Sequence, residues 1–566
     1  MSAGPQSAVL GVQRNELFRR LGAAYRWLEG VRPIHVLVPL LLLQWLAVLA
    51  LALTVRHNGW TWYQGGDQLW YYGGAWLFSH GQVPYPQTGP GWPVLLAPVA
   101  RIAGPNTAAA FPAIILFDLL VLLPVALLCI YGIGRRLGGR VFGYWAALVW
   151  IAVPYIGIKY TNTGYHQKFT ELTLPQSLGL TAMADFPSMV LILVGAYLVV
   201  RALDSDDRLT AAAAGFAAGF GAIAIKPSNA IFLIGPALAF LYRRRWTGLT
   251  VFAAGLLPSI ALLVLWKYRG FGYLPAFHSS LEPTRRVAAP VGDVFAPVHK
   301  YVHLNWHQLH KNLLGIREHF WSARVIEWLV LAGLLGVLRR SFTLFLLIGG
   351  WFAAFVILKG TYSHGSVEDT SVFRIMMPAF PAFILLLASL PLLVPGLPKR
   401  LPTSVDAFRL TRRMRLGLLG AAVVVLGALP LAAIAASSPT GPNPKLVVIT
   451  GNAPATVDSG LDLSVRRVGS DVVARWRPFK PAGTRVVYRL LRTPTDKAAP
   501  VCDAGQRSPR CTLNLEFRPA TRGTSIRDHA DPGRWTYRVG VVVNWVADPN
   551  FGDIYALSPP VDVVVP

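Results

Sequence analysis

Long apolar runs, each about twenty residues long and separated by short polar or basic segments, dominate the chain as far as residue 437. A helix needs about twenty predominantly apolar residues to cross the hydrocarbon core of a bilayer. The pattern therefore predicts a polytopic α-helical membrane protein with about 11 transmembrane helices in residues 34–437. The expected helices are 34–54, 111–133, 141–158, one from Asp185 to Arg201, two flanking a tip at 226–229, 249–266, one ending at Arg339, 342–358, one starting near Arg374, and 416–437.

After about residue 440 the pattern changes to short β-type runs separated by Gly, Pro and Asp turns. Such spacing is typical of an antiparallel β-sandwich, which we expect over residues 456–566 after a linker at 438–455. The runs are Leu461–Val465, Val472–Trp476, Thr484–Leu491 and Trp535–Val543.

Four features of this region resemble a fibronectin type III domain: Trp476, Tyr488, the segment Trp535–Val539 and Ser558–Pro560. The resemblance covers about residues 455–566. It implies that Trp476 is the buried tryptophan of the second strand, and that Trp535–Val539 belongs to the strand with the tyrosine corner. Because many unrelated proteins share this fold, the resemblance indicates a fold and no function.

Composition supports the membrane interpretation and changes the meaning of the charge. The chain is 54% hydrophobic and 14% charged, whereas soluble domains carry about 25% charged residues. The net charge of +26 would suggest nucleic acid, but most basic residues lie in short clusters between apolar runs, which is a signal of membrane topology. We therefore expect a lipid bilayer and no nucleic acid as partner.

The basic clusters predict the orientation in a bacterial plasma membrane. They place the N-terminal segment 1–33 in the cytoplasm, and with the first apolar run this segment is typical of an uncleaved signal anchor. The loops 55–110, 159–184, 267–324 and 359–373, and the C-terminal domain, are then extracytoplasmic. The clusters include Arg14, Arg19, Arg20, Arg26 and Arg32, then Arg135, Arg136 and Arg140, then Arg243–Arg245, and finally Lys399, Arg400 and Arg409–Arg415.

The three cysteines divide between the two regions. Cys129 lies inside an apolar run, where a packing role is expected. Cys502 and Cys511 lie in the C-terminal domain, close enough in sequence to close a small loop. An extracytoplasmic compartment would favour a disulfide between them.

Four charged residues fall near the expected outer membrane face, where ionisable groups are candidates for function. Each also has a structural interpretation. Asp67 follows Gly65-Gly66 and could be a turn residue, whereas Asp185 could cap the helix that it opens. Lys226 could extend to the membrane interface, and Arg374 could pair with Glu368 or Asp369. Weaker candidates for substrate binding are Tyr71, His166, Lys168 and Glu171.

The order of these features resembles the membrane-embedded GT-C glycosyltransferases, above all the protein mannosyltransferase and aminoarabinose transferase branch. The likeness spans roughly residues 34–395. It is carried by Asp67, Tyr85-Pro86, Gly91-Trp92-Pro93-Val94-Leu95-Leu96, Arg101, Gly132–Gly139, Ala184-Asp185-Phe186-Pro187, Lys226-Pro227-Ser228 and Arg374-Ile375-Met376-Met377-Pro378.

This resemblance implies a sugar donor linked to polyprenyl phosphate and an inverting transfer. The acceptor would be an extracytoplasmic envelope glycan, lipid or protein. A carboxylate near an acceptor hydroxyl can act as general base, and Arg or Lys can stabilise a leaving phosphate. We expect Asp67 to be the base and Lys226 and Arg374 to bind the donor phosphate. Asp185 would orient the acceptor or hold a divalent cation, and any other metal ligand is unknown.

The loop 267–324 contains His299, His303 and His307, which would share one face of a helix. Three imidazoles so placed could bind a metal ion. An amphipathic helix at the membrane interface, with Trp306 and Trp321 at headgroup level, accounts for the same residues and could border a groove for the lipid donor.

Two other functional classes remain open. A transporter or flippase of lipid-linked intermediates should show an inverted repeat or broken helices with charges near the bilayer midplane. No convincing repeat is present, and the candidate charges fall at one face. In the other class the chain is a non-catalytic scaffold whose working part is the sandwich.

Overall fold

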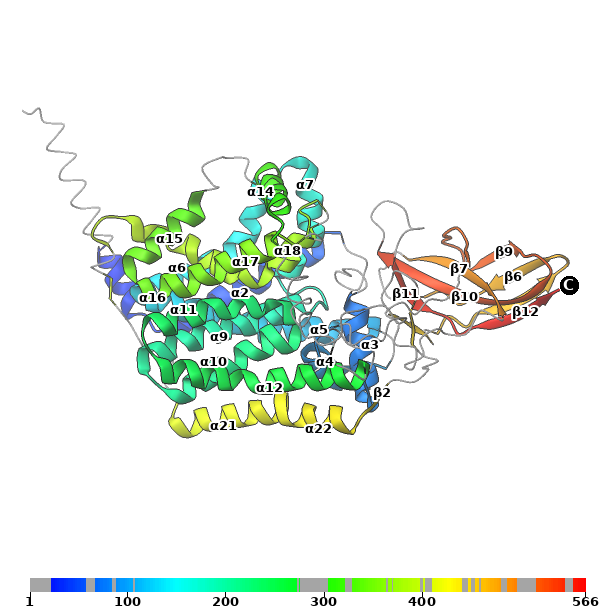
Figure 1. Cartoon of the computed structure of the whole chain (residues 1–566). Coiled ribbons are helices and arrows are strands. Elements are labelled where there is room, and N and C mark those ends of the chain that lie inside the picture. The colour runs from blue at the N-terminus through cyan, green and yellow to red at the C-terminus, as the bar shows by residue number, and fades with distance from the viewer. Residues whose placement is uncertain are drawn as a thin grey trace, which may run out of the picture.

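The computed structural model consists of a helical domain and a C-terminal β region that extends from one end of it (Figure 1). It describes residues 22–56, 67–83, 88–104, 107–271, 274, 304–320, 328–362, 365–368, 370–397, 401–402, 410–439, 446–448, 454–457, 460–479, 486–495, 516–544 and 553–566.

The helices of the first domain run mainly along one common direction (Figure 1). They are α2 (Pro33–Thr54), α3 (Asp67–Ser79), α4 (Gly91–Ala103), α5 (Thr107–Phe117), α6 (Leu123–Tyr160), α7 (Thr163–Lys168), α8 (Leu174–Ser177), α9 (Asp185–Ser205), α10 (Arg208–Gly219), α11 (Ile234–Tyr242), α12 (Trp246–Phe271), α14 (Trp306–Phe320), α15 (Leu329–Arg340), α16 (Phe342–Leu344), α17 (Gly350–Gly360), α18 (Ser371–Met376), α19 (Phe380–Ala388), α21 (Arg412–Val423) and α22 (Leu429–Ala436).

Within the described residues, eight helices are long and apolar enough to cross a membrane, so the expected number of about 11 is not confirmed. Two of the expected helices, 111–133 and 141–158, fall within one helical run, Ala110–Tyr160. The backbone leaves helical geometry at Gly138–Gly139, so the run consists of two helices that meet at a kink, as the sequence predicts. The helical run Pro227–Tyr242 and helix α15 are apolar but shorter than a full span.

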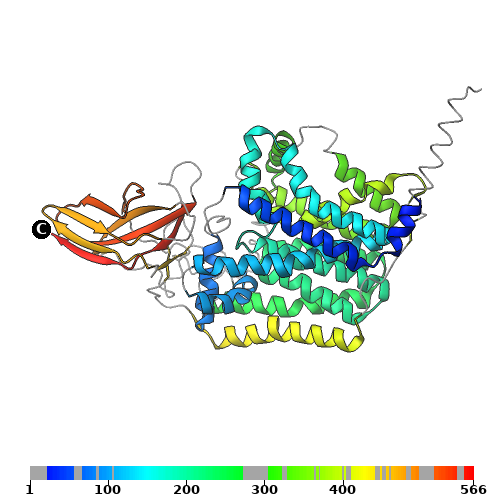
Figure 2. The same cartoon turned by 180° about the vertical axis from the view of Figure 1, so that it is seen from behind.

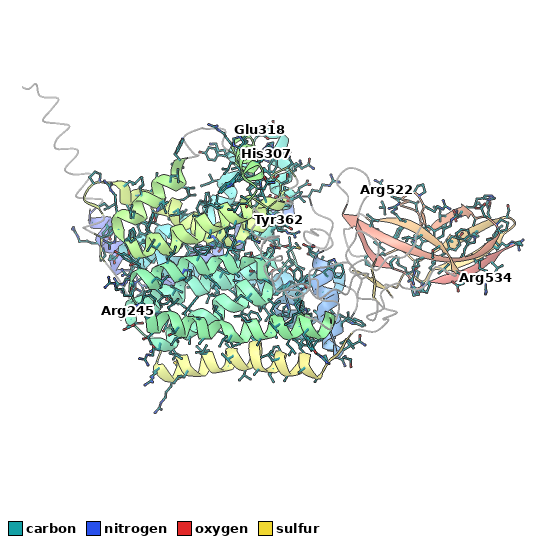
Figure 3. All side chains as sticks on the ribbon, in the orientation of Figure 1. Arg245, His307, Glu318, Tyr362, Arg522 and Arg534 are labelled. Carbon is teal, nitrogen blue, oxygen red and sulfur yellow. The ribbon has the colours of Figure 1, made fainter. Side chains whose placement is uncertain are left out.

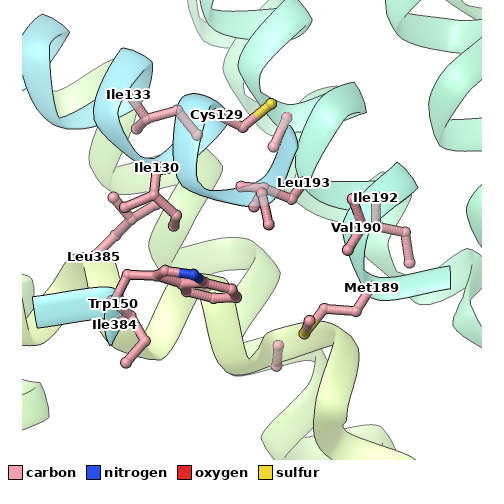
Figure 4. Close-up of a cluster of buried hydrophobic side chains, with 14 of the residues drawn as sticks. Cys129, Ile130, Ile133, Trp150, Met189, Val190, Ile192, Leu193, Ile384 and Leu385 are labelled. Atoms are coloured by element: carbon pink, nitrogen blue, oxygen red, sulfur yellow. The ribbon is translucent and has the colours of Figure 1, made fainter. Parts of the chain in front are cut away.

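Close packing of α6, α9 and α19 forms the centre of the helical domain. Trp150 of α6 lies among Met189, Leu193 and Leu385 (Figure 4). Cys129 is buried in the same cluster as a free thiol. Helix α2 packs against α6 on the side seen in Figure 2. Burial of this surface gives the rigid body whose ends carry the polar groups.

The C-terminal region contains two sheets with a shared core. The larger has the order β3 (Leu446–Val448), β4 (Pro454–Val457), β11 (Asp553–Leu557), β10 (Gly533–Asn544), β7 (Val487–Pro494) and β8 (Glu516–Phe517), with β12 (Val561–Val565) also paired to β10. The smaller is β5 (Ser464–Val468), β6 (Asp471–Arg475) and β9 (Ser525–His529).

The expected core residues of this region are buried. Trp476 is 5% exposed, and its ring lies 5.6 Å from that of Tyr488. Tyr537 donates a hydrogen bond to Asp528 across the two sheets. The C-terminal β-sheet region that the sequence predicts is therefore present. Cys502 and Cys511 lie outside the described residues, so the expected disulfide stays a prediction.

A short parallel pair connects the two regions close to α3. Strand β1 (Gln82–Val83) pairs with β2 (Ser438–Pro439), which directly follows α22. Arg269, near the end of α12, donates to the carbonyl of Ser437. Helix α3 also contacts β4. The chain therefore enters its β region beside the helix that begins with Asp67.

Candidate functional site

Four charged side chains from separate segments meet at the end of the helical domain that carries α3. Asp67, the first residue of α3, forms an ion pair with Arg374 of α18. Asp185, the first residue of α9, pairs through Oδ1 with Lys226, which follows a π-helical turn at Phe220–Ile225. Nε of Arg374 lies 3.8 Å from Oδ2 of Asp185 and joins the two pairs. The structure thus brings together all four residues selected from the sequence.

Exposure rises across this cluster of Asp67, Asp185, Lys226 and Arg374. The side chain of Asp185 is 1% exposed and that of Asp67 is 44% exposed. The exposed fractions of Lys226 and Arg374 lie between these two values. A buried carboxylate can stay ionised only beside compensating charge. Asp185 is therefore placed to hold the cations, whereas Asp67 is the carboxylate that is open to solvent.

The segment that leads into Asp185 is fixed by α3 and α4. Gln68, next to Asp67, accepts a hydrogen bond from the N–H of Ala182 at 2.8 Å, and the indole of Trp92 donates to the Ala182 carbonyl at 3.1 Å. Both side chains are completely buried. Because α3 and α4 satisfy the backbone groups of one residue from two sides, they set the position of Asp185 relative to Asp67.

The turn that carries Lys226 is held by close backbone packing. A Cβ on Gly91, at the start of α4, would lie 2.7 Å from the backbone nitrogen of Ile225, so only glycine fits there without a shift. On the other side, Asn229 donates to Ser188 Oγ at 2.9 Å, and Ser188 donates to the Gly221 carbonyl at 2.7 Å. These contacts link the turn to α9 one helical turn beyond Asp185.

Helix α14 supports the segment that ends in Arg374. Its buried Asn312 donates to the carbonyls of Gly360 and Gly365 at 2.9 and 3.0 Å. His319, near the end of the helix, lies 3.0 Å from the carboxylate of Glu368, and this hydrogen bond holds the pKa of Glu368 below its usual value. The helix expected at the membrane interface thus also positions the segment before α18.

Tyr71 and Lys359 also belong to the surroundings of the four charged residues. Burial raises the pKa of Tyr71, and the charges of Asp185 and Asp67 raise it further, so its hydroxyl stays protonated. Lys359, in the last turn of α17, lies within electrostatic range of Lys226 and Asp185. Sequence analysis did not select Lys359. Its signal was a lone lysine closing an apolar run at the expected outer face.

The weaker candidates occupy a neighbouring position and make other contacts. Lys168 donates to the Glu368 carbonyl at 2.7 Å. Glu171 accepts a hydrogen bond from Gln167 at 3.2 Å, and the side chain of His166 is exposed. Lys168 therefore joins α7 to the segment before Arg374, and a role of these residues in substrate binding stays a prediction.

The structure also tests two purely structural roles, a helix cap for Asp185 and an ion pair with Glu368 or Asp369 for Arg374. Asp185 is not the N-cap of α9, because Ala184 holds that position and the Asp185 side chain faces Lys226. The carboxylate of Glu368 pairs with His319, whereas Arg374 pairs with aspartates; Asp369 lies outside the described residues.

Metal-ligating side chains do not gather in the described part of the chain. No group of three or more His, Cys, Asp or Glu that could hold a metal ion occurs there. Of the three histidines expected on one helical face, only His307 is described; His299 and His303 lie outside the described residues, as does Trp321. Both oxygens of Asp185 already face cations.

Comparisons with protein-family models and with curated proteins identify no relative of this chain. No protein-family model matches the chain, and no curated protein matches it.

Proposed function

We propose that the protein is a membrane glycosyltransferase of GT-C type, which transfers a sugar from a polyprenyl-phosphate donor to an extracytoplasmic acceptor. The observation that carries the proposal is the meeting of Asp67, Asp185, Lys226 and Arg374 at one end of the helical domain. A polyprenyl tail fixes its phosphate at the membrane surface, so a reactive site at the end of the helices suits this donor. Plasma-membrane location and about 11 spans belong to the same proposal.

The chemistry is a single displacement with inversion. The acceptor oxygen attacks the anomeric carbon and its proton passes to the Asp67 carboxylate. The bond from that carbon to the phosphate oxygen breaks, and its electron pair leaves with the polyprenyl phosphate. Lys226 and Arg374 stabilise the charge that develops on the phosphate.

The ion pairs give the donor a second effect on the site. Arg374 contacts Asp67 directly, so an incoming phosphate competes with Asp67 for the same guanidinium. When the phosphate engages Arg374, the Asp67 carboxylate leaves its ion pair and can accept the proton of the acceptor. Donor binding would thus activate the base. Because cations surround Asp185, we assign it to holding them in place, in preference to binding a divalent cation.

A transporter or flippase is the alternative, and the position of the charges argues against it. Asp67, Asp185 and Arg374 lie at the first residues of α3 and α9 and on the short α18. These residues meet at one end of the helical domain, whereas transporter sites lie near the bilayer midplane.

The test replaces Asp67 with Asn and measures sugar transfer from a polyprenyl-phosphate donor in liposomes. Loss of a general base should lower kcat roughly 10²- to 10⁴-fold, with the donor still bound. Asp462→Asn, at an exposed aspartate of the β region, is the matched control and should keep full activity. Full activity of a folded Asp67→Asn variant would remove Asp67 from the role of base, and transport without transfer would favour the flippase.

A further inference from the structure

A second polar cluster lies at the opposite end of the helical domain, around a cavity of about 230 Å³. The cavity is formed where the α9–α10 turn meets the α11–α12 turn. Ala202, Ala211 and Phe240 make its apolar part, and Asp206, Asp207, Arg208, Arg244, Arg245 and Trp246 surround these with polar groups. Arg245, labelled in Figure 3, marks this end, which is remote from the β region.

Both acids of this cavity already have partners. Asp206 pairs with Arg245, and Asp207 pairs with Arg415 of α21. Burial alone would raise the pKa of Asp207, but a hydrogen bond from Thr210 and the charge of Arg415 outweigh it and leave that pKa below its usual value. The carboxylates are therefore neutralised from within the protein.

Two arginines remain without such compensation. Arg208 and Arg244 line the cavity, and neither has an ion-pair partner among the described residues. With the two acids paired, these guanidinium groups give the cavity a net positive charge. Guanidinium forks match the oxygens of a phosphate group, so the cavity is suited to a phosphate.

The backbone of both turns is held in an unusual geometry. Asp206 and Arg244 each have a backbone φ of 52°. This value lies in the left-handed region, which residues other than glycine adopt less often. A left-handed residue at a helix C-terminus is common, but it is usually glycine. The two left-handed residues end the turns of α9 and α11, and this places both of them at the cavity.

The rim also has the character of a membrane interface. Trp246 lines the cavity, is 61% exposed, and begins α12, one of the helices able to span a membrane. Tyr242, at the end of α11, is also exposed. Aromatic residues at helix ends lie at headgroup level, and basic pockets between membrane helices bind anionic headgroups. Basic residues that serve only to orient the chain in the membrane need no cavity around them, whereas a binding site does.

We propose that this cavity is a binding site for a phosphate group, with Arg208 and Arg244 as its ligands and an anionic phospholipid of the cytoplasmic leaflet as the source of the phosphate. The site is separate from the one that contains Asp67, and it stands whether or not the protein transfers sugars. A free phosphate compound offers the same chemistry, and the experiment distinguishes the two sources.

The test titrates the full-length protein in a neutral detergent with phosphatidylglycerol and counts bound lipids by native mass spectrometry. The wild type should bind phosphatidylglycerol in preference to phosphatidylcholine. Arg208→Gln with Arg244→Gln should weaken that binding roughly fivefold for each arginine removed. The matched control is Arg412→Gln with Arg413→Gln, which removes the same charge from exposed residues of α21 outside the cavity.

The outcomes separate clearly. Equal loss in the control pair, or equal binding of phosphatidylcholine by the wild type, would overturn the proposal, because bulk charge or apolar contact would then explain binding. Competition by millimolar inorganic phosphate would keep the site and assign it to a free phosphate, whereas resistance to phosphate assigns it to the lipid. If the double variant does not fold, Arg244→Gln alone provides the same comparison with Arg413→Gln.

Discussion

Asp67 and Asp185 carry the same functional group in different surroundings, and burial separates their roles. Asp185 is 1% exposed, with one oxygen toward Lys226 and the other toward Arg374. Asp67 is 44% exposed and is paired through one oxygen with Arg374. A general base must reach the proton that it removes. Asp67 meets that condition, and Asp185 is better placed to fix the cations on which the donor would bind.

Lys359 gives the first prediction at the residue scale, because it adds a third basic side chain to a cluster in which two cations are balanced by two aspartates. Lys359→Met should weaken binding of polyprenyl phosphate by at least about tenfold, as expected for loss of a charge-assisted hydrogen bond. Direct binding and the donor KM are the measurements. Lys159→Met, at an exposed lysine near the end of α6, is the control and should bind normally. Unchanged binding by Lys359→Met would exclude Lys359 from the donor site.

Tyr537 gives a prediction for alkaline pH. Burial raises its pKa, and the hydrogen bond to Asp528 raises it further. A tyrosine with a raised folded pKa stabilises the protein fully below its unfolded pKa of about 10, and this stabilisation is lost as pH rises above that value. The thermal stability of the β region should therefore fall above about pH 10. Tyr537→Phe should be less stable at pH 8 and show a flatter dependence above pH 10; an unchanged slope would contradict the assignment.

At the scale of elements, the contact between α4 and the turn before Lys226 is the most restrictive. A methyl group on Gly91 would meet the Ile225 backbone, which cannot rotate away as a flexible side chain can. Gly91→Ala should cost about 1–3 kcal/mol of stability through overpacking and lower transfer activity by moving Lys226. Thermal unfolding in detergent and the transfer assay are the measurements. Gly420→Ala on α21 is the control, because an added Cβ there would meet no neighbouring atom within 4 Å. Equal effects of the two changes would exclude the packing explanation.

The elements also show where prediction from sequence succeeds. The spacing of hydrophobic residues and the length of each apolar run indicate the apolar helices and the short strands, because both signals are local in the sequence. Asp67, Asp185, Lys226 and Arg374 were found because each stands at a boundary between an apolar run and a loop and also matches, in order, the resemblance to GT-C glycosyltransferases. Their pairing joins residues up to 307 positions apart, and no local pattern encodes such a distance.

The kink at Gly138–Gly139, where two helices meet, confirms the expected division between the spans 111–133 and 141–158. Other features were missed because they depend on contacts between residues far apart in the sequence. The role of α14 depends on Asn312, whose burial against two carbonyls follows from tertiary packing. Lys359 was missed because a lysine ending an apolar run is an ordinary topology signal until the structure places it beside Lys226.

At the scale of the whole molecule, polar chemistry is divided between the two ends of the helical domain. One end carries α3, which begins with Asp67, beside the β region, and the other carries Arg245 (Figures 1 and 3). Arg245 lines the cavity together with Arg208 and Arg244. The two sites are separated by the long apolar helices, which is the arrangement expected when a bilayer lies between them. A donor and a structural lipid could thus bind from opposite leaflets without competing.

The position of the β region leads to the last prediction. The β1–β2 pair attaches it beside α3, so a polymer bound to the sandwich would lie close to Asp67. A chain that ends after Pro439 keeps this pair and should retain a folded helical domain with transfer to a short soluble acceptor. If the β region holds the acceptor, transfer to a polymeric envelope glycan should fall, because the truncated chain no longer raises the local concentration of acceptor. Comparing the two acceptors within one preparation controls for loss of protein, and an equal fall for both would show that the β region supports the fold of the site and does not guide the acceptor.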